Sequence, residues 1–419
     1  MSTIPVAVIG ASGYASVHHR GIAHGEKLGL CRLEAVTMLK PYREELGEPE
    51  KAAEFAERGV RIYDDYRAML EGERGRVRLV TVPTGIALHA PMSIDALNAG
   101  YDVYCEKPMA GTVADARAML EAEARSGRTL CLGYQHLSRP TIQRIKSHAV
   151  HGRYGELRRA RCRVIWPRPQ SYYRRNDWAG RVTVNGSVIR DSPLQNATAH
   201  YLQNMLYIAG PGPNEAAAPV EVYAENYRAN PIESADTQFV RVVTTEEAHI
   251  EMWVTHAGPR NVHPAMVLDF EDARLEWSVE GETVVYQGDR EVDRVRDPEL
   301  PDRLLIIENI LRSLAAGERP YSVGANSVQH VETIEAVFDA SKICTIPRTH
   351  LAARLGDRTV DLPPSVDDWS DDLIVTIADI EGIITNRYKD GKSFAEAGLP
   401  WAEPGATVRL SGRAGGASR

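Results

Sequence analysis

Hydrophobic residues in the first third of the chain occur in short runs that alternate with segments of helical period. Each run is rich in Val, Ile, Leu or Tyr and has the length of a buried strand. Strands separated by helical segments are typical of βαβ units, in which a crossover helix connects parallel strands. The pattern therefore predicts an α/β domain built on a doubly wound, parallel Rossmann sheet. The predicted strands lie within residues 4–10, 33–39, 77–83, 101–108 and 128–134.

Two of the connecting helices have end signals of their own. Residues 89–100 form one crossover helix, and Gly100 lies just past its last turn. Residues 112–127 form another, with Thr112 as N-cap, Asp115 three residues later and Gly127 past the end. We therefore expect both helices to end close to these glycines.

The pattern changes after Tyr134. Long β-like runs follow at residues 220–229, 237–256 and 264–288, and short polar turns interrupt them. Extended strands joined by short turns predict an open, mainly antiparallel sheet, here with helices on one face, so the second half is α+β. We predict three regions, namely an α/β domain over 1–136, an α+β domain over 137–345 and an extension over 346–419 whose last residues are disordered.

Length and composition indicate a soluble globular protein. The 419 residues exceed one ordinary core, and 43% of them are hydrophobic and 25% charged. No run approaches the ~18 apolar residues of a membrane helix, and the N-terminus lacks the parts of a secretion signal. We therefore expect a cytoplasmic protein with no membrane partner. Five cysteines without a CxxC pair indicate buried, reduced thiols.

The charge pattern narrows the possible partners. A formal net charge of −8 argues against nucleic acid, because phosphate binding needs a basic surface. Residues 153–175 are a basic exception, and their partial alternation with apolar residues predicts the solvent face of a strand. This stretch could also attract an anionic substrate. The histidines form no metal-ligand grouping with carboxylates or thiolates, so we predict no metal.

A glycine-containing turn follows the first predicted strand. Gly10, Ser12 and Ala15 occupy the positions of a G-x-G-x-x-G motif, and Gly13 and Tyr14 lie between them. This motif needs a tight turn and small residues where the backbone meets a pyrophosphate and where the helix meets the sheet. An ordinary βα turn is the alternative. Because the turn is the first of a βαβ series, we predict a dinucleotide site.

The second strand ends without the acidic residue that binds the ribose hydroxyls of NAD. Lys40 stands there instead, and Arg43 follows three residues later. Both cations can bind a 2′-phosphate, so the cofactor is NAD or NADP, with NADP slightly favoured. The alternative is that both side chains are solvated and that the ribose is held by other groups.

Polar residues cluster where the third and fourth predicted strands would end. Pro83, Thr84 and His89 follow one run, and Glu106-Lys107-Pro108 ends the next. Ligands of open parallel sheets bind at the carboxyl ends of the strands. With the Gly-Glu-Arg-Pro turn at residues 317–320 and the following sheet domain, these features resemble the Gfo/Idh/MocA oxidoreductases over residues 4–345.

The resemblance implies a role for each residue at this strand end. Lys107 would reach the substrate hydroxyl, Glu106 would face the nicotinamide ribose, and Pro108 would turn the chain, with a cis bond possible. His18 matches a histidine on the first helix of the family. Independently of the resemblance, hydride removal from an alcohol leaves a developing alkoxide, which a fixed ammonium such as that of Lys107 stabilises.

A second catalytic group is expected in residues 178–210, which resemble the family segment carrying Asp-x-x-x-His. His200 matches the histidine, but Asn196 stands where the family has the aspartate. An amide can hydrogen-bond an imidazole but does not raise its pKa as a carboxylate does. Asp191 could enter the site from the preceding loop. A core histidine is the alternative reading of His200, and we favour catalysis by Lys107 and His200.

Substrate contacts are expected from the second domain and from the strand ends. A polyol needs paired hydrogen-bonding groups and an aromatic face. The predicted contacts are Tyr134, His136, Arg139, Trp178, Arg181, Asp191, Asn196 and His200. Each of them could equally be an ordinary packing or surface residue.

These features predict an NAD(P)-dependent oxidoreductase acting on a secondary alcohol or ketone of a sugar, inositol or related polyol. One alternative is a redox-assisted sugar lyase or glycosidase that recycles its cofactor. Another is a catalytically silent regulator that senses a dinucleotide or sugar. By analogy with the family, the exposed face of the open sheet predicts a homo-oligomer, a dimer or tetramer. The extension would cap a subunit contact, cover the active-site mouth or add a surface layer.

Overall fold

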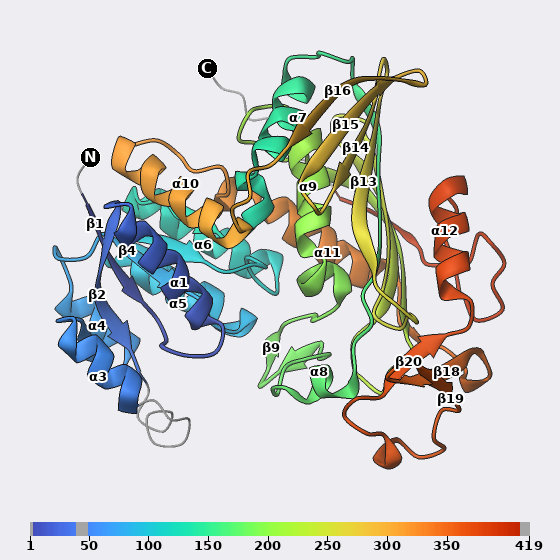
Figure 1. The fold of residues 1–419 in the computed structure, drawn as a ribbon, viewed down its shortest axis with the longest axis horizontal. Coiled ribbons are helices and arrows are strands. Elements are labelled where there is room, and N and C mark those ends of the chain that lie inside the picture. The colour runs from blue at the N-terminus through green and yellow to red at the C-terminus, as the bar shows by residue number, and fades with distance from the viewer. Residues whose placement is uncertain (1–2, 39–48, 411–419) are drawn as a thin grey trace. The chain divides into compact units, whose positions relative to one another are not determined.

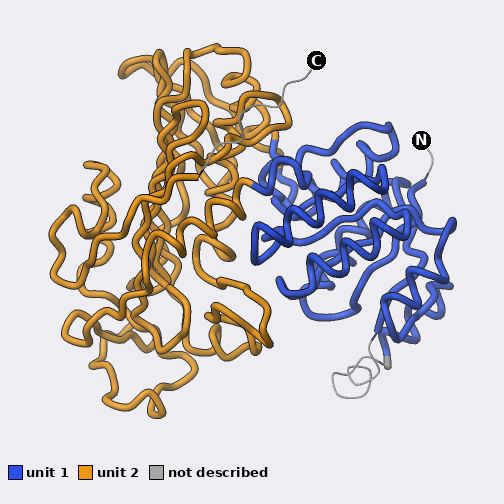
Figure 2. Tube along the Cα trace, turned by 180° about the vertical axis from the view of Figure 1, so that it is seen from behind, with its two compact units in different colours: residues 1–139, 299–328 blue, residues 140–298, 329–419 orange. Residues whose placement is uncertain are grey.

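The computed structural model describes residues 3–38 and 49–410. Two compact units make up the chain (Figure 2). The first contains residues 1–139 and 299–328, and the second contains residues 140–298 and 329–419. Residues 299–328, which we predicted in the second domain, thus belong to the first unit.

The first unit contains a six-stranded parallel sheet with the order β3-β2-β1-β4-β5-β6 (Figure 1). This is the Rossmann order, and it confirms the predicted fold class. The additional strand, β3, has only three half-buried residues, too few for a hydrophobic pattern. The strands are β1 Ile4–Val8, β2 Cys31–Thr37, β3 Arg61–Tyr63, β4 Leu79–Val82, β5 Asp102–Cys105 and β6 Leu130–Leu132.

Helix α6 begins and ends where the sequence signals it, and α5 ends before Gly100 as predicted but begins at Ile86, three residues earlier than predicted. In α6, the Thr112 hydroxyl accepts the Asp115 N–H at 3.1 Å, and Gly127 ends the helix with φ +64°. Gly100, with φ +94°, follows α5. The helices are α1 Ala15–Lys27, α3 Pro49–Glu57, α4 Tyr66–Gly72, α5 Ile86–Asn98, α6 Val113–Ser126 and α10 Asp302–Ala316, and one-turn 3₁₀ helices cover Gln135–Ser138 and Gly324–Asn326.

Helix α10 belongs to the first unit because its apolar side packs on α1. Ile307 and Leu311 lie against Gly21 and Gly25, where the absence of side chains lets the two helices approach. A methyl group on Gly25 would lie 2.7 Å from the Leu311 side chain. The two glycines of α1 therefore allow close packing of α10, which lies about 280 residues later in the sequence.

The second unit contains a ten-stranded sheet with the order β16-β15-β14-β13-β7-β12-β11-β10-β17, and β21 also pairs with β10. Most neighbours are antiparallel, as predicted, and β7 with β12 and β10 with β17 are parallel. Its strands are β7 Leu157–Ile165, β10 Pro219–Arg228, β11 Thr237–Thr244, β12 His249–Thr255, β13 Val262–Phe270, β14 Arg274–Ser278, β15 Glu282–Gln287, β16 Arg290–Arg296, β17 Ile343–Thr345 and β21 Thr407–Arg409.

Helices cover both faces of this sheet rather than the single face we predicted. Helix α9 packs on β7 and β12 from one side, and α12 packs on the same strands from the other (Figure 1). A small hairpin joins β8 Thr183–Val184 to β9 Ser187–Val188. The helices are α7 Pro140–Val150, α8 Gln170–Arg174, α9 Ala199–Ala209, α11 Val328–Ala340 and α12 Ile380–Asp390.

The predicted extension forms a layer on the second sheet. Strands β18 Leu351–Leu355, β19 Arg358–Val360 and β20 Ile374–Ile377 form a small sheet before α12. The layer shares a core with the ten-stranded sheet, and the Trp253 indole donates to the Lys392 carbonyl at 3.1 Å. The predicted disorder of the last residues falls on 411–419, which lie outside the described residues.

This layer overturns the expectation of a solvent-facing side chain for two arginines of β7, Arg161 and Arg163, whereas Arg158 is exposed. The Arg163 guanidinium donates to the Thr385 hydroxyl at 2.8 Å, and that of Arg161 donates to the Tyr388 carbonyl at 3.1 Å. Both guanidinium groups also lie over the Tyr388 ring, that of Arg163 at 5.2 Å and that of Arg161 at 5.5 Å from its centroid. The sheet face over which we expected another subunit is therefore covered here by the chain itself, and oligomerisation stays a prediction.

Candidate functional site

The turn after β1 has the geometry that a dinucleotide loop requires. Gly10 has φ +109°, and its N–H donates to the Thr37 hydroxyl at the end of β2, at 2.9 Å. A Cβ on Gly10 would lie 3.3 Å from the Ala15 Cβ, so the turn is also closely packed. The Ser12 carbonyl accepts the Ala15 N–H at 3.1 Å where α1 begins. The turn therefore leads directly into a helix N-terminus, which favours a bound anion.

Tyr14 and Gly13 complete this loop. Gly13 has φ +59° and open space around it, so a bound group can approach its backbone. The Tyr14 side chain is 43% exposed, and the Arg303 guanidinium lies 5.7 Å from its ring centroid. Lys40 and Arg43 lie outside the described residues.

Glu106 is buried at the end of β5, and both of its carboxylate oxygens have partners. Oε1 lies 3.0 Å from His18 Nε2, and Oε2 accepts the Lys107 N–H at 3.1 Å. The His18 ring stacks on Tyr104, with 4.6 Å between centroids. A Cβ on Gly133 would lie 2.7 Å from Oε2, so only glycine leaves room for the carboxylate there.

This environment keeps Glu106 ionised. Burial by itself raises the pKa of the carboxyl group, but the hydrogen bond from His18 and the charges of His18 and Lys107 lower it further than burial raises it. The net pKa lies below its ordinary value. The Lys107–Pro108 bond is cis, as the resemblance implied. A fixed negative charge therefore stands beside Lys107 at the carboxyl end of the parallel sheet.

His89 connects the ends of β4 and β5. Its Nδ1 lies 2.7 Å from the Pro108 carbonyl oxygen, and its Nε2 lies 3.1 Å from that of Thr84. Burial lowers the pKa of His89, and the two carbonyl groups oppose this only in part. His89 therefore holds the loops after β4 and β5 together. Pro83, directly after β4, is buried as well.

Buried hydroxyl groups at the strand ends of the first unit are consistent with a bound nicotinamide dinucleotide. Within residues 3–38 and 49–410, the hydroxyls of Thr81 and Thr84 are buried and have no hydrogen-bond partner. Buried polar atoms without a partner are rare in proteins, and a polar ligand at the strand ends would satisfy them. Together with the Gly10 turn, these hydroxyls support a bound cofactor at this edge of the sheet.

Three of the predicted substrate contacts lie close together after β6. The Arg139 guanidinium donates to both carboxylate oxygens of Asp302, each at 2.6 Å, and His136 Nε2 lies 3.5 Å from the same carboxylate. Burial and the Arg139 charge lower the pKa of His136 to about 3. Burial also raises the pKa of Tyr134. Arg139 and His136 thus tie the 3₁₀ turn to α10, and substrate contact by all three residues stays a prediction.

The second unit contains the remaining predicted residues. Asp191 is buried, and its carboxylate accepts hydrogen bonds from the Gly180 N–H at 2.7 Å and from the Asn196 amide at 2.8 Å. A π-helical turn, Pro193–Ala197, leads into α9, and half-buried His200 lies in the first turn of α9. The structure thus brings Asp191 and Asn196 together, although they are five residues apart.

Trp178 and Arg181 lie on the loop that leads to Asp191. The Trp178 carbonyl accepts the Arg181 N–H at 3.1 Å, and the Arg175 guanidinium lies 5.2 Å from the Trp178 ring centroid. Trp178 is half-buried and Arg181 is exposed. Lys107 belongs to the first unit and His200 to the second, so their convergence on one substrate stays a prediction.

Sequence reasoning missed two residues that shape the first site. The Thr37 hydroxyl accepts the Gly10 N–H and so stabilises the turn. The sequence signal that could have identified Thr37 is a hydroxyl residue at the end of a buried strand. Lys51, in the first turn of α3, donates to the Ala11 carbonyl of the loop at 3.3 Å. No sequence pattern indicated that contact, because α3 reaches the loop only through the tertiary fold.

Neither metal ligation nor a membrane span appears in the described part of the chain. Residues 3–38 and 49–410 contain no group of three or more His, Cys, Asp or Glu side chains placed to bind a metal. No helix among them is both long and apolar enough to cross a bilayer. The five cysteines are free thiols, and four of them are buried.

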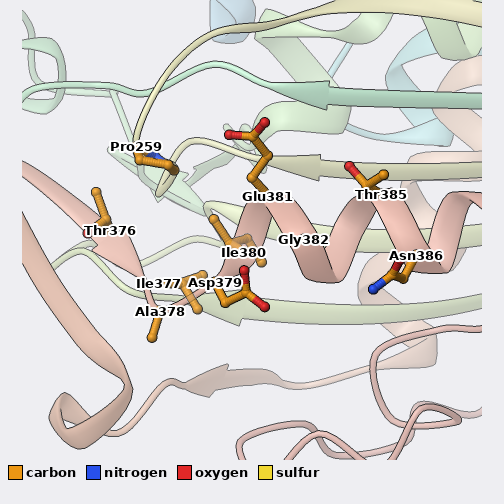
Figure 3. Close-up of a pocket in the computed structure, with 10 residues that line it drawn as sticks. All are labelled: Pro259, Thr376, Ile377, Ala378, Asp379, Ile380, Glu381, Gly382, Thr385 and Asn386. Atoms are coloured by element: carbon orange, nitrogen blue, oxygen red, sulfur yellow. The ribbon is translucent and has the colours of Figure 1, made fainter.

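A cavity of about 460 Å³ lies in the C-terminal layer, at the start of α12 (Figure 3). Asp379 and Glu381 stand at this helix N-terminus, and Glu381 is already paired with Arg260 at 2.8 Å. Their negative charges oppose the anion binding that a helix N-terminus otherwise favours. The cavity contains none of the predicted site residues.

The sheet order, the Gly10 turn and the polar strand ends define a dinucleotide-binding protein of the Rossmann type. Residues 4–134 match the family described as "Oxidoreductase family, NAD-binding Rossmann fold". Over these residues the chain is similar to the Gfo/Idh/MocA oxidoreductases, the family that its motifs resemble.

Two curated relatives and one solved structure illustrate the likeness. The inositol 2-dehydrogenase of Pseudomonas fluorescens is 28% identical over 176 residues, which are 41% of this chain and 49% of that protein. The match thus spans about half the length of that relative. The D-xylose 1-dehydrogenase (NADP(+)) of Haloarcula marismortui is 21% identical over 323 residues, 75% of this chain and 84% of that one.

The solved structure is the WlbA dehydrogenase from Bordetella pertussis in complex with NADH and UDP-GlcNAcA. It has a TM-score of 0.65 and 21% sequence identity, and the match covers 80% of this chain and 95% of that one. At this identity, the likeness supports the fold.

Proposed function

We propose that this protein is an NAD(P)-dependent dehydrogenase or reductase that acts on a secondary alcohol or ketone of a sugar, inositol or related polyol. The observation that carries the proposal is the strand end at Glu106 and Lys107. A buried, ionised carboxylate next to a lysine, at the carboxyl edge of a parallel sheet with a dinucleotide turn, suits redox chemistry at a carbinol carbon.

The reaction gives each predicted residue a separate task. In the oxidative direction the carbinol C–H bond breaks, its electron pair leaves as hydride, the O–H proton leaves and a C=O bond forms. The bound nicotinamide supplies the hydride acceptor. The Lys107 ammonium stabilises the negative charge that develops on the substrate oxygen, and His200 accepts the proton. The Glu106 carboxylate balances the charge of Lys107.

NADP is the cofactor that we slightly favour. Lys40 and Arg43 supply cations after β2 in the sequence, and Lys51 adds an ammonium group 3.3 Å from the loop carbonyl of Ala11. Cations on this side of a dinucleotide loop suit a 2′-phosphate. The name of the Haloarcula relative, which includes NADP(+), supports the same choice.

The names of two relatives, inositol 2-dehydrogenase and D-xylose 1-dehydrogenase, support this substrate class. We infer that Trp178 and Tyr134 supply aromatic surface and that Arg181 supplies hydrogen bonds. The partner is then a small polyol or sugar.

Two measurements test this function. Thermal shift with NADH and NADPH reports cofactor binding directly, because a ligand of the folded state raises the melting temperature. Nicotinamide absorbance with a panel of polyols and keto-sugars then reports hydride transfer. We expect Lys107→Met to bind the cofactor normally and to lose activity by about a hundredfold or more. Cofactor binding without turnover on any member of the panel would contradict the proposal.

A further inference from the structure

The basic stretch over residues 153–175 contains eight arginines, and the fold provides partners for six of them. Four form ion pairs with carboxylates and two donate to hydroxyl groups; in this order they are Arg158, Arg159, Arg161 and Arg174, then Arg153 and Arg163. Among the residues that the structure describes, neither Arg168 nor Arg175 has a carboxylate partner. These two arginines are therefore the part of the basic stretch that the fold leaves without a counter-charge.

The Arg168 and Arg175 side chains are held by aromatic rings. Both guanidinium groups lie over Tyr172, at 4.8 Å from its ring centroid for Arg168 and 3.6 Å for Arg175. Arg168 also lies 5.7 Å from the Trp166 centroid, and Arg175 lies 5.2 Å from that of Trp178. Stacking uses the face of a guanidinium group and leaves N–H groups at its edge for an oxyanion. These five side chains form an arginine–aromatic cluster with two positive charges, which repel each other until an anion binds.

A buried donor without an acceptor is an independent sign of a ligand at this cluster. Within residues 3–38 and 49–410, the Arg168 Nε atom is buried and has no hydrogen-bond partner, and the same holds for the Tyr173 hydroxyl. Such atoms are rare because a buried donor that bonds to nothing is costly. Burial raises the pKa of Tyr173, and the Arg168 charge opposes this only in part, so the phenol keeps its proton near pH 7. Both groups can therefore donate to an oxyanion.

The nearest carboxylates do not take the place of that anion. After burial, the charges of Asp191 and Asp236 are the largest causes that raise the pKa values of Tyr172 and Tyr173, respectively. Both carboxylates are buried and already accept hydrogen bonds, Asp191 from a backbone N–H at 2.7 Å and Asp236 from another at 2.8 Å. In the described part of the chain, neither forms an ion pair with an arginine of the cluster.

The cluster lies beside the first turn of α9, which carries His200. The Trp166 ring meets the Tyr201 ring edge-on, with 5.9 Å between the centroids. Trp178, which belongs to the cluster, is also an expected substrate contact. This placement suits an anion on the same molecule as the hydroxyl group that His200 would deprotonate.

We propose that Arg168 and Arg175 bind an anionic group of the substrate, a carboxylate or a phosphate ester, so that the sugar or polyol of the proposed reaction is an acidic one. The inference rests on the proposed function and specifies its substrate. The planar guanidinium fork matches the paired oxygens of either anion. The anion only binds, and it takes no part in the transfer of hydride or proton.

The test compares neutral and acidic substrates in the full-length protein with NAD or NADP. D-glucose, D-galactose and myo-inositol are the neutral members, and D-glucuronate, D-galacturonate, D-glucose 6-phosphate and myo-inositol phosphate are the acidic ones. We expect kcat/KM for the best acidic member to exceed that for its neutral counterpart by about tenfold or more, since a charge-assisted hydrogen bond contributes at least that factor. Equal values for neutral and acidic members would overturn the inference.

Arg168→Gln and Arg175→Gln should each lower kcat/KM for the acidic member by about tenfold and leave that for the neutral member unchanged. Arg168→Lys keeps the charge without the fork and should give a smaller loss. The matched control is Arg158→Gln, because Arg158 is an exposed arginine of the same stretch that pairs with Glu271, and it should keep the preference for the acidic member. A merely structural role of Arg168 and Arg175 predicts equal losses on neutral and acidic members, and that result would refute the inference.

The comparison within the panel also identifies the source of the anion. Higher kcat/KM for D-glucuronate assigns a carboxylate, and higher kcat/KM for D-glucose 6-phosphate assigns a phosphate ester. The affinities for NADH and NADPH, measured by calorimetry, should not change in Arg168→Gln or Arg175→Gln. Weaker cofactor binding in these variants, without a preference for acidic substrates in the wild type, would assign the arginines to a cofactor phosphate and overturn the inference.

A measurement without turnover separates this inference from the proposed function. NMR of ¹⁵N-labelled arginine follows the Arg168 Nε–H signal, which is assigned by its absence from the spectrum of Arg168→Gln. D-glucuronate or D-glucose 6-phosphate, added with NADH, should shift this signal, and D-glucose should not. A shift without turnover of any panel member contradicts the proposed function and supports the anion site. An Arg168 signal that no acidic member shifts refutes the anion site, whatever the activity.

Discussion

The Glu106→Gln substitution measures how strongly the buried charge holds the strand end. The Glu106 side chain is 8% exposed and makes contacts at 3.0 Å to His18 and 3.1 Å to the Lys107 N–H. Breaking a buried ion pair costs about 3–5 kcal/mol, and an amide that keeps one acceptor contact recovers about 1 kcal/mol. We expect the free energy of unfolding of the first unit to fall by about 2–4 kcal/mol.

A matched control lies in the same unit. His24 and Glu308 form another histidine–glutamate pair, at 3.5 Å, but their side chains are 21% and 24% exposed. Surface pairs contribute about 0–1 kcal/mol, so Glu308→Gln should change stability little. Urea unfolding followed by far-UV circular dichroism, with hydrogen exchange of peptides from the first unit, compares the two variants. Equal stability losses in both would refute the reasoning.

The pH dependence gives a second check on Glu106. Its pKa is lower in the folded protein than the ordinary value of 4.5, so the folded state binds a proton less readily than the unfolded state. The stabilisation is therefore complete above pH ~4.5 and is lost as the pH falls through the folded pKa. The stability difference between wild type and Glu106→Gln should shrink in that range, and a constant difference would contradict the assigned charge.

Two other substitutions test the cofactor side and the helix packing. Lys51→Ala should weaken NADPH binding by about tenfold in calorimetry and leave NADH binding unchanged. The reason is that one charge-assisted contact to a phosphate contributes roughly 1.5–3 kcal/mol. Equal effects on the binding of both cofactors would exclude a contact between Lys51 and the 2′-phosphate. Gly25→Ala should lower the unfolding free energy by about 1–3 kcal/mol, because the new methyl lies 2.7 Å from Leu311 and from Cys31. In a double-mutant cycle, Leu311→Ala should relieve part of that loss, and strict additivity would speak against the contact.

Local sequence patterns predicted the first unit well. The hydrophobic runs located its strands because a buried parallel strand needs consecutive apolar residues. Thr112 and Gly127 marked the ends of α6 because capping depends on residues within one turn. Glu106 and Lys107 were predicted as site residues because charged residues at the end of a buried strand have few structural uses, and their role stays a prediction. The cis bond before Pro108 came from the family resemblance.

Contacts between distant residues were not predictable in this way. The sequence showed the arginines of β7 but not that α12 covers them, since Arg163 and Thr385 are 222 residues apart. It showed Asp191 and Asn196 but not their hydrogen bond, because a π-helical turn changes the spacing between the loop and α9.

The sequence by itself determined the two kinds of sheet, the dinucleotide turn and the residue types at the strand ends, since each depends on neighbours along the chain. Only the tertiary structure decided that α10 packs on α1, that the C-terminal layer covers the second sheet, and that Glu106 is held by His18. These features depend on which surfaces are complementary after folding, and side chains from distant segments meet only when the whole chain has packed.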